Sequence, residues 1–156
     1  MDIRVSRLKL LSPLFYTPDE GLKDAFLPLE EGEGELLFCF ELEEANYRSF
    51  EPDKGIFFEK MIFAGRAVKM LSCGPLPAAV QIGGKELSVG QFQLAAGNYL
   101  FSQERRLLTK EEAAALALEI QAEGLWQRLN LGRKLYLRRL FEDGSQVTQI
   151  FRPREE

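Results

Sequence analysis

Short apolar segments separated by turn residues make up most of the first two thirds of the chain. From 36 to 43, every second side chain is large and apolar, a period that predicts a strand with one apolar face. Two runs, 79–82 and 85–88, flank Gly83-Gly84, which predicts a tight hairpin. Because turns recur about every 8–12 residues, we expect an antiparallel sandwich or barrel here.

The N-terminal segment carries an irregular version of this pattern. The apolar positions of residues 3–10 shift by one near Ser6-Arg7. Since a shift of one residue moves side chains to the other face of a sheet, the pattern predicts a strand with a β-bulge at this point.

One later segment has a helical period. Thr109-Lys110-Glu111-Glu112 matches a capping box, with Thr109 as the N-cap and Glu112 at the third helical position. Apolar side chains then recur at helical spacing on one stripe, namely Ala113, Leu116, Ala117 and Ile120. Gly124 stands where a glycine commonly ends a helix, so we expect one long helix near 109–124.

The chain closes with a predicted hairpin. Its strands, 134–142 and 145–152, are joined by Asp143-Gly144, a strong signal for a two-residue turn. Together these elements predict an α+β fold that is mostly antiparallel β, in one domain over 1–156. Within it, 1–108 forms a β-rich body and 109–156 a helix-plus-hairpin subunit.

Composition supports a single globular domain. The chain has 156 residues, with 46% hydrophobic and 11% aromatic side chains, which is enough apolar surface for one core. Histidine is absent. That absence excludes Ser-His-Asp triads, Cys-His dyads and imidazole metal sites.

The cysteines and the apolar runs bear on the cellular compartment. Cys39 lies inside an apolar strand pattern and Cys73 precedes a Gly-Pro turn, so we expect two free thiols and no disulfide. No segment approaches the roughly 18 consecutive apolar residues of a membrane span, and the first residues lack the apolar core of a signal peptide. We therefore expect a cytoplasmic protein without a membrane partner.

Charge is distributed unevenly along the chain. The net charge is −4, but 19–59 contains 13 acidic and 3 basic residues, whereas 125–154 contains 7 basic and 2 acidic residues. Such segregation indicates solvated faces, stretches that neutralise each other within the fold, or complementary surfaces of two copies. A homo-oligomer in which 30–44 meets Arg128–Arg139 of a neighbour is one hypothesis.

Motifs for catalysis, phosphate binding and metal binding are missing from the sequence. It contains no G-x-S-x-G elbow, no P-loop and no EF-hand loop. The glutamates between 30 and 35 indicate a solvated loop more than a cation site. Glu59 and Lys60 interrupt an apolar run, which predicts either a buried charge pair or a position at a sheet edge. We expect no cofactor and no metal.

The basic C-terminal stretch is the strongest candidate for a ligand or partner surface. Cations beside aromatic rings can hold phosphates and stack bases. The candidate residues are Trp126, Arg128, Arg133, Tyr136, Arg138 and Arg139. Against a nucleic-acid surface, Arg138 and Arg139 are neighbours on a strand and point to opposite faces, and the helix carries glutamates but no arginine.

The stretch 92–101 resembles the F-x-[IL]-P-A-G-x-Y-x-x-F segment of GyrI-like effector-binding domains, in its apolar strand, A-G-x-Y turn and second apolar strand. Ala95 stands where that family usually has proline, and the family's ligand-site glutamate has no assignable counterpart. The resemblance covers about ten residues and does not place the chain in that family. It implies a small-molecule pocket between a sheet and helices.

These observations favour a non-catalytic binding or interaction protein whose partner is a protein or a small molecule. Enzymatic activity is left open, although the usual catalytic bases are missing. Two alternatives remain: a nucleic-acid-binding protein that uses the basic hairpin, and a hydrolase that depends on paired carboxylates.

Overall fold

The computed structural model describes residues 5–11, 14–18, 25–28, 34–42, 56–67, 79–82, 85–88 and 92–155. The elements of these residues are strands β1 (Ser6–Leu10), β2 (Leu14–Pro18), β3 (Leu36–Glu41), β4 (Met61–Ala67), β5 (Ala79–Ile82), β6 (Lys85–Ser88), β7 (Phe92–Leu94), β8 (Gly97–Glu104), β9 (Asn130–Leu131), β10 (Lys134–Glu142) and β11 (Ser145–Glu155), the short 3-10 helix η1 (Ile56–Phe58) and helix α2 (Lys110–Trp126).

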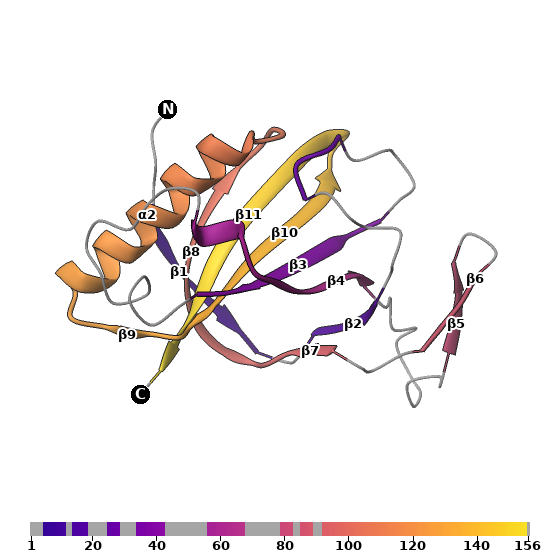
Figure 1. The fold of residues 1–156 in the computed structure, drawn as a ribbon, viewed down its shortest axis with the longest axis horizontal. Coiled ribbons are helices and arrows are strands. Elements are labelled where there is room, and N and C mark those ends of the chain that lie inside the picture. Colours follow the sequence, from indigo (N-terminus) through magenta and orange to yellow (C-terminus); the bar gives the residue numbers. More distant parts are fainter. Residues whose placement is uncertain are drawn as a thin grey trace.

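Nine of the strands form one antiparallel sheet. Its order is β1-β8-β11-β10-β3-β4-β2-β7, and β9 pairs with the end of β11. Only Ala95 and Ala96 separate β7 from β8, although these strands lie near opposite ends of the sheet. The sheet must therefore curl, and Figure 1 shows it as a half-barrel with α2 on one side. The expected α+β fold is confirmed.

The expected pairing of 79–82 with 85–88 is also confirmed, with Val80 of β5 opposite Leu87 of β6, whereas Gly83 and Gly84 lie outside the described residues. This pair forms a two-stranded sheet of its own and lies to the side of the main sheet in Figure 1.

Both faces of the sheet are largely buried along β3, β10 and β11. Because side chains of successive residues point to opposite faces, these strands contribute to two separate apolar clusters. The first face packs beneath α2 and η1 and includes Leu36, Phe38 and Phe40 of β3. The second is the concave face of the half-barrel and includes Leu37 and Cys39 of the same strand. We call these the helix-side face and the concave face.

Helix α2 begins as the sequence predicts. The Glu112 amide donates to Thr109 Oγ1 at 3.2 Å, and the Thr109 amide donates to Glu112 Oε1 at 3.2 Å. This reciprocal pair satisfies two amide groups that the helix leaves free at its start. The predicted stripe, represented by Leu116 and Ile120, is fully buried against the helix-side face.

The predicted end of the helix is wrong. Gly124 lies inside α2, which continues to Trp126 with Gln127 as its C-cap. The turn that ends the helix is centred on Arg128, whose φ is 58°, while the Leu129 amide donates to the Gly124 carbonyl at 2.8 Å. These are the features of a Schellman motif with arginine in the left-handed position that glycine usually takes.

The predicted bulge is wrong as well. Along Ser6–Leu10, β1 pairs with β8 in an unbroken register from Ser6 opposite Phe101 to Leu10 opposite Gly97. The sheet has its irregularity elsewhere, between Cys39 and Phe40 of β3, where the register with β4 shifts. The alternation in residues 3–10 breaks because β1 is half-exposed and its polar positions are not strictly constrained.

The C-terminal hairpin is confirmed at both strands. Asp143 and Gly144 have φ values of 54° and 77°, as a two-residue type I′ turn requires. Strand β11 continues past the expected Arg152 to Glu155, where β9 pairs with it.

Cys39 is buried and free, as expected from its place in β3. Cys73 lies outside the described residues. Among the described residues, no helix combines the length and the apolar character that crossing a membrane requires.

Candidate ligand-binding site

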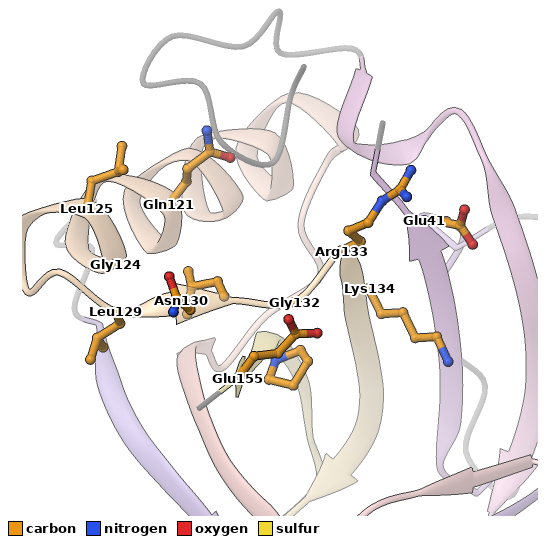
Figure 2. A pocket seen from close by; sticks show the side chains of 12 residues that line it. Glu41, Gln121, Gly124, Leu125, Leu129, Asn130, Gly132, Arg133, Lys134 and Glu155 are labelled. Carbon is orange, nitrogen blue, oxygen red and sulfur yellow. The ribbon is translucent and has the colours of Figure 1, made fainter. Parts of the chain in front are cut away.

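A cavity of about 710 Å³ opens where the C-terminal half of α2 meets β9, the start of β10 and the end of β11 (Figure 2). Its walls combine aliphatic, amide and charged side chains of both signs. The lining residues are Glu41, Gln121, Gly124, Leu125, Leu129, Asn130, Leu131, Gly132, Arg133, Lys134, Pro153 and Glu155.

The cavity exists because the chain turns sharply after α2 and runs back beneath it. The Arg128 turn sends the chain into β9, which pairs with the end of β11 through Leu131 opposite Arg154. Gly132 then passes close to β11, where its amide donates to the Pro153 carbonyl at 2.8 Å. A Cβ on Gly132 would lie 2.9 Å from the Pro153 ring, so a larger residue would push these strands apart.

A second glycine sets the distance between α2 and β9. A Cβ on Gly124 would lie 2.6 Å from a methyl carbon of Leu131. Glycine inside a helix costs roughly 0.5–1 kcal/mol relative to alanine. Here it lets the Leu131 side chain pack directly on the helix backbone, which explains why a glycine stands inside the helix at this position.

Gln121 is the buried polar group of the cavity, with 1% of its surface exposed. Its Oε1 accepts a hydrogen bond from Arg152 Nη1 at 3.4 Å. Its Nε2 has no hydrogen-bond partner among the described residues. A buried donor without a partner is costly, at about 1–3 kcal/mol, and a ligand that accepts from Nε2 would remove that cost.

Arg152 lies behind Gln121 and is fully buried. Its Nε and Nη2 donate to the Gly132 carbonyl at 3.2 and 2.7 Å. One guanidinium group thus connects Gln121 of α2 to Gly132, which lies between β9 and β10, and fixes the position of the Gln121 amide.

The rim of the cavity carries two cations and two carboxylates. Arg133 Nε donates to the Leu42 carbonyl at 3.1 Å, which holds the start of β10 against the end of β3. Glu41 faces Lys60, with Nζ and Oε1 3.5 Å apart. Lys134 and Glu155 are exposed and form no salt bridge within the described part of the chain.

The six residues of the predicted surface fall into three places. Arg133 lines the cavity. Trp126 and Arg128, at the end of α2, are neighbours in the chain of the lining residues Leu125 and Leu129. Both are exposed, Trp126 to 84%. The other three, Tyr136, Arg138 and Arg139, lie in the interior of the sheet.

Tyr136 and Arg138 belong to the concave face. The Tyr136 ring stacks on Phe151 at a centroid distance of 5.4 Å, and burial raises the pKa of its hydroxyl. Arg138 forms a salt bridge with Glu35, whose other oxygen accepts from the Tyr16 hydroxyl at 2.7 Å. These groups bind one another inside the fold, although Arg138 Nε is buried without a hydrogen-bond partner among the described residues. They therefore do not form a phosphate-binding surface.

Arg139 points to the opposite face, as strand alternation requires, and is 3% exposed. Its guanidinium donates to the backbone carbonyls of Ala25 and Leu27 and to Gln146 Oε1. The six candidate residues therefore do not share one surface, because both faces of β10 are covered.

The hypothesis of a buried Glu59–Lys60 pair is also wrong. Both side chains are exposed, and Lys60 pairs with Glu41, the last residue of β3. The apolar run around them is interrupted because the chain passes from η1 into β4 at this point, where side chains reach solvent.

Among the described residues, no group of three cysteine or acidic side chains lies close enough to hold a metal ion. Of the glutamates between 30 and 35, only Glu35 lies within the described residues, and it is engaged by Tyr16 and Arg138.

The sequence analysis missed Gln121, Asn130 and Glu155 as cavity residues. For Gln121 a signal was present: it lies eight positions after Ala113 and four after Ala117, on the apolar stripe of the helix. A polar residue on a buried stripe calls for a partner. Asn130 and Glu155 carry no comparable pattern.

Comparison with known proteins adds no relative, since no protein-family model and no curated protein matches this chain.

Proposed function

We propose that this protein binds a small molecule in the cavity between α2, β9 and β10, and that it acts by binding and not by catalysis. The observation that carries the proposal is the Gln121 amide, which is buried at the cavity with its donor unused. The volume of about 710 Å³ lies within the range of roughly 300–1,000 Å³ that is typical of small-molecule sites.

The chemistry of the walls supports binding. Amides such as Gln121 and Asn130, together with aliphatic side chains such as Leu129, are common in sites that recognise a ligand by shape and hydrogen bonds. The chain contains no histidine, the side chain that most often acts as a general base near neutral pH. Of the two carboxylates, Glu41 is engaged by Lys60.

Nucleic-acid binding loses its main support, because Arg138 and Arg139 lie inside the fold with protein partners. We also propose a cytoplasmic location, which the free thiol of Cys39 favours because reducing compartments keep thiols unpaired.

A ligand screen tests the proposed function. Wild-type protein is screened by thermal shift against a diverse set of metabolite-sized compounds, and the dissociation constants of the hits are measured by calorimetry. We expect hits that Gln121→Met weakens about fivefold, the cost of roughly one hydrogen bond. The control is Gln103→Met, which removes an exposed glutamine of β8 that bonds to Gln149.

A screen without hits would contradict the proposal. So would hits whose affinity Gln121→Met and Gln103→Met change equally. Because Gln121→Met also removes an acceptor from Arg152, circular dichroism and the unfolding midpoint of both variants are recorded first.

A further inference from the structure

We infer, on the basis of this proposed function, that the ligand is a zwitterion about the size of a dipeptide. Its carboxylate accepts from Gln121 Nε2, its ammonium group is recognised by Glu155, and its hydrocarbon part lies on the leucines of the cavity. Three independent features of the walls lead to this chemistry.

The first feature is the fixed orientation of the Gln121 amide. A guanidinium group only donates hydrogen bonds, so the atom of Gln121 that faces Arg152 must be the oxygen. The nitrogen is then the atom left without a partner. Rotating the amide by 180° would place two donors against each other, so the nitrogen remains the atom that needs an acceptor.

The second feature is a pair of opposite charges that the fold leaves unused. Lys134, at the start of β10, and Glu155, at the end of β11, form no salt bridge within the described part of the chain. Glu41, by contrast, is paired with Lys60. An uncharged ligand would desolvate Glu155 without compensation, whereas the ammonium group of a zwitterion compensates that charge. The ligand carboxylate that accepts from Gln121 then carries the charge opposite to that of Lys134 at the same cavity.

The third feature is the aliphatic part of the lining. Leu129 and Leu131 are half-buried at the cavity, and Pro153 lies beside them. Figure 2 shows Leu129 beside Asn130, where the chain leaves the helix, and Glu155 beside Gly132. A ligand that covers them gains the burial of apolar surface, at about 25 cal/mol per Å². We therefore expect hydrocarbon side chains on the ligand.

A matched series of probes tests this inference. The probes are Leu-Leu, its N-acetyl form, its C-terminal amide and the doubly capped form, which share their side chains and differ only in the end charges. By calorimetry we expect Leu-Leu to bind wild-type protein most tightly, each single cap to weaken binding about tenfold, and the double cap to weaken it further.

Two variants assign each end of the ligand. Glu155→Gln should remove the difference between Leu-Leu and its N-acetyl form, because the carboxylate that recognises the ammonium group is gone. Gln121→Glu keeps an acceptor for Arg152 and replaces the donor by a carboxylate, so it should weaken Leu-Leu about tenfold or more. The control is Glu142→Gln, at the turn of the C-terminal hairpin, where Glu142 meets Arg105.

The outcomes separate this inference from the proposed function. Equal affinity for the four probes would overturn the inference. So would no binding of any probe while the metabolite screen yields ligands that Gln121→Met weakens, and in that case the proposed function would stand. No binding of the probes together with a screen without hits would overturn both.

Discussion

The helix-side face and the concave face of the main sheet are equally well buried but are built from different side chains. Beneath α2 the contacts are largely aliphatic, with side chains such as Leu135 and Ile150 at 0% exposure. Inside the curl more of the buried side chains are aromatic, and the rings of Tyr99, Tyr136 and Phe151 lie within 5.4–6.4 Å of one another. A helix covers the first face, whereas the second is covered by the sheet's own curvature.

The difference shows how each face handles polar groups. On the helix-side face, Arg139 and Arg152 are buried and donate to backbone carbonyls. On the concave face, the polar groups bond to one another, as in the group formed by Tyr16, Glu35 and Arg138. In both cases arginine stabilises the interior, so a run of basic residues in the sequence does not establish a basic surface.

The accessibility of the Cys39 thiol tests the concave face most strongly. We expect native protein to react with an alkylating reagent at least about a thousandfold more slowly at Cys39 than unfolded protein does, because access requires opening of the sheet. Burial raises the pKa of this thiol from 9.0 to about 12, so little thiolate forms in the folded state.

The same shift predicts a pH dependence. Because the pKa of the folded state exceeds that of the unfolded state, the contribution of the thiol to stability is full below pH 9 and is lost as the pH rises toward 12. Cys39→Ala should therefore flatten the alkaline decline in the free energy of unfolding. An identical decline in both proteins would contradict this assignment.

The next largest effect compares a phenylalanine on each face. Phe38 and Phe151 are both 0% exposed, on the helix-side face and the concave face respectively. Replacing either by alanine should lower the free energy of unfolding by about 3–5 kcal/mol in urea titrations. A loss below about 1 kcal/mol for Phe151→Ala alone would mean that the concave face is not a packed core.

The next prediction compares the loss of stability when a buried arginine, Arg139, or an exposed one, Arg105, is replaced by leucine. Arg139→Leu leaves the carbonyls of Ala25 and Leu27 without this donor and should cost about 2–4 kcal/mol, since each unpaired buried group costs about 1–3 kcal/mol. The matched control is Arg105→Leu, because Arg105 pairs with Glu142 in solvent and should contribute less than about 1 kcal/mol. Equal losses would place Arg139 at the surface.

These comparisons also show what the sequence could predict. Features set by neighbouring residues were predictable, such as the Thr109 capping box, the Asp143-Gly144 turn and the two short strands around Gly83-Gly84. The order of the strands was not, because it depends on pairings between distant segments. The end of α2 was missed because Leu131, from a later strand, requires glycine at 124.

The candidate site was predicted only in part. Arg133 was identified from its charge, but the cavity depends on β9, a strand of two residues that has no readable period. The basic residues of β10 were assigned to the surface since their charge suggests exposure. Strand alternation placed Arg138 and Arg139 on opposite faces, and the sequence could not show that both faces are covered.

Loss of the N-cap of α2, the helix that covers the helix-side face, should lower the free energy of unfolding by a smaller amount. Thr109→Ala removes the side chain that accepts from the Glu112 amide and should cost about 0.5–2 kcal/mol. Thr109→Ser retains the hydroxyl, so it should lower the free energy of unfolding much less than Thr109→Ala does. Urea titrations with equal midpoints and slopes for wild type and Thr109→Ala would argue against the cap.

The smallest effect concerns the end of α2. There Arg128 takes the left-handed conformation that glycine usually takes after a helix, and Gly124 lies inside the helix. Arg128→Gly should raise the free energy of unfolding by about 0.5–1 kcal/mol, because φ of 58° suits glycine. Gly124→Ala should lower it despite alanine's better helix propensity, since the new methyl meets Leu131. A stabilising Gly124→Ala would contradict the close packing of α2 on β9.

The strand order has a consequence for synthesis of the chain. Strand β1 pairs with β8, and β3 with β10, where Leu37 lies opposite Arg138, about 100 residues later. The segment 97–155 contains α2 and the mutually paired β8, β11 and β10, so its partners are close in sequence. A nascent chain that stops before β10 leaves β3 without that neighbour, and with both of its apolar faces uncovered. We therefore expect the ribosome-bound chain to depend on chaperones until β10 and β11 emerge, and these two strands to act as the template on which the earlier ones assemble.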